Sequence, residues 1–237
     1  MEIVEAASKA GTFFVTAYMK RFFPAAQKAK ELLSGMGRII SVYARSWQPS
    51  ENWWCDTSQS VNKAFGDYVR DRYSGGVLVC GGSHILDLLH WFAGKPVTVA
   101  GQMFSGEIGF DIQANAMLTY QDGSVAHFET CWHGYQFAGH ERNGWDERLE
   151  INAATGRLDL YTVKWDHPEN NGALLVHQDA KTGVTTEYRF PAVNPFHIEI
   201  AENLKRFENK EPGFPSAWDG YVVDKVIDEL IAGSKDM

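Results

Sequence analysis

The second half of the chain alternates short strand-like segments with turn signals, and this pattern constrains the fold more than any other feature. Such segments follow residue 95: "PVTVAGQMF", "ANAMLTYQDGSVAHFETCWH", "LEINAATGRLDLY", "ALLVH" and "GVTTEYRF". Within them, "QDGS" and "ATGR" are typical of hairpin turns, because glycine supplies the positive φ that tight turns require. Strands joined by short local turns pair antiparallel. The pattern therefore predicts an antiparallel meander of about five or six strands.

Helical patterns flank this region on both sides. They predict helices over residues 2–10, 60–73, 195–210 and 216–233. Two more helices are predicted: one has Pro24 in its first turn and Gly35 at its end, and the other lies between Ser83 and Gly94. Ser83 suits an N-cap, and Ser216 with Asp219 has the spacing of a capping box. Two further strands are expected at residues 12–19 and 37–47. The predicted fold class is α+β, a mostly antiparallel open-faced sheet with helices packed on one face.

The net charge and the cysteines narrow the class of protein. With a net charge of −8, the chain shows neither a basic patch for nucleic acid nor a basic amphipathic helix for a membrane surface. No apolar run approaches the roughly 18 residues that cross a bilayer. The three cysteines show no CxxC spacing, and the acidic start of the chain is not a secretory signal. The sequence therefore predicts a cytoplasmic protein with reduced thiols and no nucleic-acid or membrane partner.

Residues 75–91, "GGVLVCGGSHILDLLHW", contain two glycine pairs and a histidine at the start of a helix. A dinucleotide fingerprint needs a G-x-G-x-x-G arrangement, whereas Gly81 and Gly82 are adjacent and no third glycine follows before Gly94. His84 and Asp87 share one face near the helix N-terminus. The helix dipole there lowers the pKa of a histidine, which keeps the ring neutral and able to accept a proton near pH 7. A catalytic histidine and a capping or core histidine both remain open from these residues alone.

The stretch "SGGVLVCGGSHILDLLHWFAGKPVTV" resembles a motif of the glucose–fructose oxidoreductase/inositol dehydrogenase/MocA family. Members of that family have a glycine pair, an apolar run and an aspartate, then a histidine four residues later and a second aspartate three residues beyond. Further stretches follow the family's order: "VTAYMKRFFPAAQKAKELLSGMGRIISV", "YQDGSVAHFETCW", "LEINAATGRLDLY" and "PSAWDGYVVDKVIDEL". The resemblance covers nearly the whole chain.

The resemblance implies a mechanism. Members of the family transfer a hydride between a nicotinamide cofactor and a sugar, polyol or related hydroxyl compound, with the histidine as acid/base and a lysine from an E-K-P turn assisting. It implies that His84 is the acid/base and that Asp87 supports the active-site helix. Cys80 stands where the family pattern expects the first aspartate. A neutral thiol cannot orient an imidazole as a carboxylate does, so either the substrate or mechanism differs or Cys80 is a small side chain in a tight turn.

The resemblance also implies that the nucleotide-binding domain, with its E-K-P lysine, is missing. Residues 1–20 are then the tail of that Rossmann-type domain, and residues 21–237 form the substrate-binding and oligomerisation domain. The chain, a late-starting polypeptide or a fragment, is expected to be inactive alone. NAD or NADP is expected for the full-length enzyme, and neither is expected to bind this chain tightly. The alternative is a non-catalytic α+β module that dimerises and binds a sugar-like ligand.

Other side chains are candidates for ligand contacts. Trp47 and Trp53 could stack on a sugar ring or simply pack in a core or interface. Arg45 and Lys20 could contact an anionic substrate or a cofactor phosphate, or be solvated surface charges. Tyr18 could approach the nicotinamide. These assignments give Trp47, Arg45 and Trp53 as candidate substrate residues, and Tyr18 and Lys20 as candidate cofactor residues.

The segment "HFETCWH" places His127, Glu129, Cys131 and His133 on one face of a strand. Successive residues on that face lie about 7 Å apart, so four in a row cannot share one zinc ion, and no metal site is predicted. A polar sheet face at a subunit contact or substrate pocket is the preferred interpretation. In the family that the chain resembles, the open face of this sheet commonly forms the oligomer interface, which implies a homo-oligomer.

Overall fold

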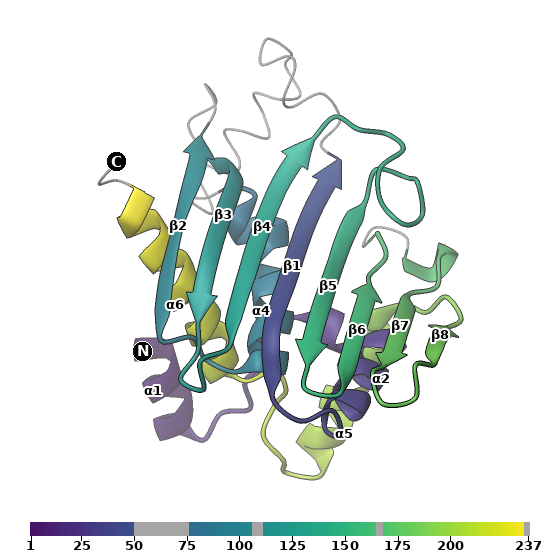
Figure 1. The fold of residues 1–237 in the computed structure, drawn as a ribbon. Helices are drawn as coiled ribbons and strands as arrows, with labels where there is room; N and C mark the ends of the chain where they lie inside the picture. The colour runs from purple at the N-terminus through teal and green to yellow at the C-terminus, as the bar shows by residue number, and fades with distance from the viewer. Residues whose placement is uncertain (50–75, 106–110, 165–167, 235–237) are drawn as a thin grey trace.

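Strands and hairpins form one sheet in the computed structural model, which describes residues 1–49, 76–105, 111–164 and 168–234 (Figure 1). The helix predicted at residues 60–73 and the candidate Trp53 lie outside these ranges. The strands are β1 (Ile39–Pro49), β2 (Thr98–Ser105), β3 (Asp111–Thr119), β4 (Val125–His133), β5 (Asp146–Ala153), β6 (Gly156–Tyr161), β7 (Leu174–Asp179) and β8 (Thr185–Arg189).

The sheet has eight strands in the order β2-β3-β4-β1-β5-β6-β7-β8. All neighbours pair antiparallel except β1 and β4, which are parallel. The predicted α+β class and the local hairpins are confirmed. The insertion of β1 between β4 and β5 was not predicted, because a pairing between distant segments leaves no local turn signal in the sequence.

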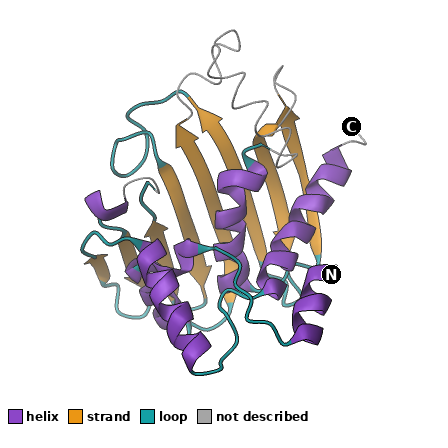
Figure 2. Ribbon diagram, turned by 180° about the vertical axis from the view of Figure 1, so that it is seen from behind, coloured by secondary structure: helices purple, strands orange, loops and turns teal. Residues whose placement is uncertain are grey.

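The described helices all lie on the same side of the sheet (Figure 2). They are α1 (Glu2–Ala10), α2 (Pro24–Leu33), α4 (Ser83–Ala93), α5 (Pro195–Glu208) and α6 (Ala217–Ser234), with α1 against α6. The end signals act as expected, since Gly11 closes α1 with a φ of 60° and Pro24 opens α2. The Ser216–Asp219 capping box also forms: the Ser216 backbone N–H donates to the Asp219 carboxylate at 2.7 Å, and the Asp219 N–H donates to Ser216 Oγ at 3.3 Å.

The strand predicted at residues 12–19 is wrong. This segment runs outside the sheet, with the Thr16 N–H donating to the carbonyl of Pro215 at 2.9 Å, and it ends in a 3₁₀ turn over Met19–Phe22. Bulky β-branched and aromatic residues favour a strand only where another strand lies beside them. None of the described strands pairs with this segment, so its propensity is not realised.

The prediction of Ser83 as N-cap is also wrong. A π-helical turn, Leu78–Gly82, runs directly into α4, so the backbone of Ser83 is already helical with φ −58°. Its hydroxyl donates instead to the carbonyl of Cys80 at 2.9 Å. Turns of this kind are frequent at functional sites.

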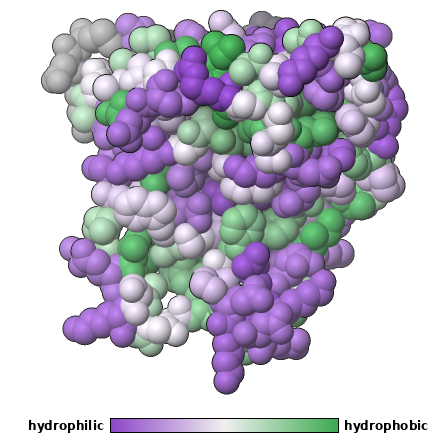
Figure 3. All heavy atoms as spheres, turned by 60° about the horizontal axis from the view of Figure 1, so that its bottom comes forward, coloured by the Kyte–Doolittle hydropathy of each residue, from purple (hydrophilic) through white to green (hydrophobic). Residues whose placement is uncertain are grey.

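The hydrophobic core lies between the sheet and the helices. Alternate residues of the strands, such as Val42, Ala44, Phe128, Leu149 and Ile151, pack against Ile85, Leu88, Leu89, Val223 and Ile227. The other face of the sheet is uncovered (Figure 1), and Tyr43 and Met117 are exposed there. At the lower end of the molecule, apolar side chains form separate patches among hydrophilic ones (Figure 3).

Candidate functional site

The glycines at residues 76–82 allow close packing in a tight turn. A Cβ on Gly76 would lie 1.8 Å from the carbonyl oxygen of Asp111, and one on Gly81 would lie 1.9 Å from Nε2 of Gln48. The backbone N–H groups of Gly76 and Leu78 both donate to the Asp111 carboxylate at 2.7 Å. A protein carboxylate therefore occupies the place that a phosphate would take in a cradle. The residues of this turn do not fit a nucleotide phosphate.

The π-helical turn and the first turn of α4 place His84 on the helix-covered side of the sheet. Its ring meets the Tyr18 ring edge-on, with centroids 5.4 Å apart. Within the described part of the chain, Nδ1 is buried without a hydrogen-bond partner. Burial lowers the pKa of His84 to about 4; the Lys20 cation adds to this effect and Glu147 opposes it. The imidazole is therefore neutral near pH 7, as predicted, and burial is the largest cause.

A buried ion pair lies beside this histidine. Lys20 Nζ donates to the Glu147 carboxylate, and both side chains are inaccessible to solvent. The same carboxylate accepts hydrogen bonds from Ser46 Oγ at 2.9 Å, Gln48 Nε2 at 2.9 Å and Thr162 Oγ1 at 2.8 Å. Burial alone would raise the pKa of Glu147, but Lys20 and these hydrogen bonds hold it below its usual value. Glu147 is therefore a fixed carboxylate anion inside the protein.

The expectation that Lys20 could be a solvated surface charge is wrong, since it is 1% exposed. Sequence analysis also missed Ser46, Gln48 and Glu147. A signal was present: along β1 the inward positions change from Val42 and Ala44 to Ser46 and Gln48. Along β5 they change from Ile151 and Leu149 to Glu147. The register pairs Ser46 with Glu147, so both polar ends meet.

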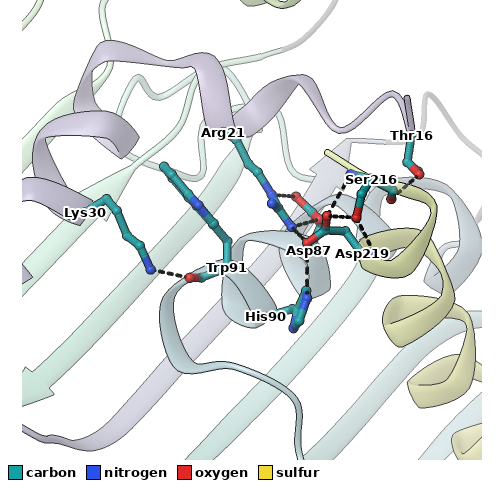
Figure 4. Close-up of polar contacts among 8 residues, drawn as sticks. All are labelled: Thr16, Arg21, Lys30, Asp87, His90, Trp91, Ser216 and Asp219. Carbon is teal, nitrogen blue, oxygen red and sulfur yellow. Dashed lines mark hydrogen bonds and ion pairs between the residues drawn. The ribbon is translucent and has the colours of Figure 1, made fainter. Parts of the chain in front are cut away.

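A second polar cluster lies one turn further along α4, around Asp87 (Figure 4). Arg21 donates to both carboxylate oxygens of Asp87, at 2.8 and 2.6 Å, and to Asp219 at 2.9 Å. His90 Nε2 lies 3.2 Å from the same Asp219. Burial raises the pKa of Asp87 to about 6 although Arg21 opposes it, so the carboxylate is ionised near pH 7. Asp87 thus ties α4 to the 3₁₀ turn at Met19–Phe22, and Arg21 extends the network to α6.

Cys80 lies in the π-helical turn that leads to His84. Burial raises the pKa of its thiol to about 11, and the charge of Asp111 adds to the effect. The thiol is therefore uncharged near pH 7. It brings no negative charge to the histidine from the position where the family pattern expects a carboxylate.

Arg45 and Trp47 lie on the open face of the sheet, opposite to His84. Arg45 pairs with Glu129 and, at 3.0 Å, with Asp146, and its guanidinium lies 4.7 Å from the centroid of the Trp47 ring. A hollow of about 690 Å³ on this face is lined by residues that include Tyr43, Arg45, Asn115, Met117, His127, Glu129, Arg148 and Glu150. The structure does not bring Arg45 and Trp47 together with His84.

The histidines and cysteine of β4 do not gather around one point. His127 stacks on Tyr43 with ring centroids 4.8 Å apart, and Cys131 is buried. Among the described residues, no three His, Cys, Asp or Glu side chains are grouped so that they could hold a metal ion. In the same part of the chain, none of the helices has the length and apolar character needed to span a membrane.

The fold is an open, mostly antiparallel sheet with the described helices on one side, and comparison with protein families gives the family of the chain. A family model described as the GFO/IDH/MocA C-terminal domain matches residues 26–159. This match covers more than half of the chain, so the chain belongs to that family. The predicted resemblance is therefore confirmed. A search of curated proteins gave no match.

Solved structures share the fold along nearly all of this chain. An oxidoreductase domain protein from Kribbella flavida superposes with a TM-score of 0.76 at 20% identity, over 99% of this chain and 67% of that one. A levoglucosan dehydrogenase bound to NADH and levoglucosan gives a TM-score of 0.75 at 18% identity, over 98% and 69%. An aldose-aldose oxidoreductase from Caulobacter crescentus complexed with glycerol gives a TM-score of 0.76 at 16% identity, over 99% of this chain and 65% of that one. The chain thus spans about two thirds of the length of these proteins.

Proposed function

We propose that this chain is the substrate-binding and oligomerisation part of a NAD(P)-dependent oxidoreductase that acts on a sugar, a polyol or a related hydroxyl compound. The observation that carries the proposal is His84, a neutral imidazole at the start of α4, with Tyr18 on one side and a buried ion pair nearby. Family membership supports it, and one structural neighbour is a dehydrogenase bound to a sugar derivative and NADH.

The chemistry follows from the state of His84. Oxidation of a hydroxyl carbon removes a hydride from carbon and a proton from oxygen, and a neutral imidazole is suited to take that proton. In the reverse direction the imidazolium returns it. Tyr18, beside the ring, is proposed to lie on the side from which a nicotinamide approaches.

The cofactor is proposed to be held by a separate nucleotide-binding domain. The amides of Gly76 and Leu78 already donate to Asp111, so the glycine-rich turn does not offer them to NAD or NADP. We assign residues 1–20 to the end of the nucleotide-binding domain and residues 21–237 to the substrate domain, which is inactive alone. The whole assembly is proposed to be cytoplasmic.

The open face of the sheet is proposed to bind a second copy of the chain. Tyr43 and Met117 are exposed on it, 50% and 47%, next to the charged side chains of Arg148 and Glu150. A face that offers both signs of charge around apolar side chains suits a self-complementary contact. Met117→Glu should then shift the protein toward monomer in sedimentation velocity, and an unchanged sedimentation coefficient would exclude this face.

The substrate proposal is tested by NMR titration of the chain with glucose, myo-inositol and levoglucosan. We expect the ring signals of His84, assigned by their loss in His84→Ala, to shift with at least one of them, with weak affinity. The matched control is His127, an exposed histidine on the open face. If the ring signals of His127 respond while those of His84 do not, the sugar site is the open-face hollow and the proposal is wrong.

A further inference from the structure

We propose that Lys20 and Glu147 are positioning residues for His84: their buried ion pair fixes the electrostatic surroundings in which the imidazole exchanges its proton. This inference deepens the proposed function and rests on it. In this proposal the negative charge of the site comes from Glu147 on β5, and not from residue 80 in the turn that leads to His84.

The first support is a closed circuit of contacts around the histidine. Lys20 binds Glu147, and Glu147 accepts a hydrogen bond from Gln48 at 2.9 Å. The Gln48 amide fills the space against Gly81, in the turn directly before α4. On the other side, Tyr18, two residues before Lys20, packs edge-on against the His84 ring at 5.4 Å. The same short segments therefore hold both the ion pair and the histidine.

The second support is the rigidity of the anion. Lys20, Ser46, Gln48 and Thr162 all donate to Glu147, and Thr162 also donates its backbone N–H to the Glu147 carbonyl at 3.1 Å. Lys20 Nζ lies over the Trp145 ring at 5.3 Å, which limits its movement on that side. Charges that cannot move and are shielded from water act strongly on a neighbouring titrating group.

The third support is the lack of a charged alternative among the described groups that act on His84. Cys80 is a neutral thiol, and Tyr18 is a neutral phenol whose pKa is raised by burial. Asp87 lies on the same helix as His84, but its carboxylate is bound by Arg21. The charges that act on the imidazole come from Lys20, which disfavours its protonation, and from Glu147, which favours it.

The test uses substitutions that break the same ion pair but remove opposite charges. Lys20→Met leaves the anion and should raise the pH at which the His84 ring titrates, by about one unit. Glu147→Gln leaves the cation and should lower it. The titration is followed by NMR of labelled imidazoles in the 237-residue chain, with the His84 signal assigned by its loss in His84→Gln.

A merely structural role predicts a different pattern. Both substitutions would then destabilise the fold and move the His84 titration in the same direction or not at all, and either result overturns the proposal. Glu187→Gln, which breaks an exposed ion pair with Arg189 on β8, is the matched control and should leave the titration unchanged. Lys20→Met/Glu147→Gln removes both charges and should return the midpoint toward that of the natural chain. A variant that unfolds in buffer is measured in sucrose, which favours the folded state and does not titrate in this pH range.

The outcomes also separate this inference from the proposed function. Opposite shifts of His84 without any response to sugars would keep the ion-pair assignment and reject the substrate assignment. Sugar binding at His84 without opposite shifts would keep the substrate assignment and reject the ion-pair assignment.

Discussion

At the scale of the residue, sequence reasoning found His84 and named Tyr18 and Lys20, but it did not predict the ion pair between Lys20 and Glu147. His84 stands out because a helix start, two glycine pairs and a family motif meet there. Lys20 and Glu147 are separated from it by long stretches of chain, and only the β1–β5 register brings Glu147 to Ser46 and Gln48. Local patterns carry little information about such contacts. The polar residues that interrupt the inward apolar alternation of both strands were the available sign.

The low pKa of His84 makes a prediction about stability and pH. The ordinary value of 6.5 applies to the unfolded chain, whereas the folded value is about 4. Between these values the unfolded state binds more protons, so His84 lowers stability as pH falls from 6.5 toward 4. The loss is about 1.4 kcal/mol per pH unit within this window.

His84→Gln cannot titrate, so its unfolding free energy should fall less steeply than that of the natural chain over the same range. Urea unfolding at several pH values measures the difference. Parallel pH profiles for the two proteins would mean that the imidazole titrates normally in the folded state.

A second prediction at this scale concerns Gly81. An alanine there would place its Cβ against the Gln48 amide, which is held by Glu147 at 2.9 Å and by Ser46 at 3.3 Å. Because that amide is not free to swing away, Gly81→Ala should cost about 1–3 kcal/mol in urea unfolding. Gly35→Ala is the control, since its Cβ would meet only an ordinary contact at 3.7 Å. Equal stability of the two variants would show that Gln48 adjusts without loss.

At the scale of the element, the ends of helices were predicted better than the pairing of strands. The ends of α1 and α2 and the capping box of α6 follow from nearby residues and are present. The strand at residues 12–19 is absent and β1 enters the middle of the sheet, because pairing depends on which segments meet in space. The same limit explains Asp87, whose partner Arg21 comes from the 3₁₀ turn and was not predicted.

The Arg21–Asp87 pair gives the prediction at this scale. Asp87→Asn keeps the shape but leaves the buried guanidinium with Asp219 as its one charged partner among the described residues, so it should destabilise the fold by about 3 kcal/mol. Ser216→Ala, which removes only the capping hydroxyl next to Asp219, should cost about 1 kcal/mol. Thermal and urea unfolding compare the two. A loss for Asp87→Asn no larger than that for Ser216→Ala would mean that Asp87 is not ionised in the folded protein.

At the scale of the whole molecule, the two faces of the sheet carry different kinds of side chain. The helices lie on one side of the sheet and leave the other face open (Figures 1 and 2). His84 and both buried charge clusters lie on the helix-covered side, and exposed aromatic and charged side chains lie on the open face. The sequence predicted the class of fold and the family because alternating strands and motif order are properties of the chain itself. It did not predict that Arg45 and Trp47 face away from His84, since a strand pattern does not say which side the helices cover.

The central claim is that this chain carries the substrate and proton-transfer part of the site, while the dinucleotide is held elsewhere. The most direct test is a titration of the 237-residue chain with NADH and NADPH, followed by energy transfer from its tryptophans to the nicotinamide. We predict no saturable signal up to millimolar concentration, because the Asp111 carboxylate already occupies the amides of the glycine-rich turn. Saturable binding in the micromolar range would contradict the account and would make that turn a cofactor site.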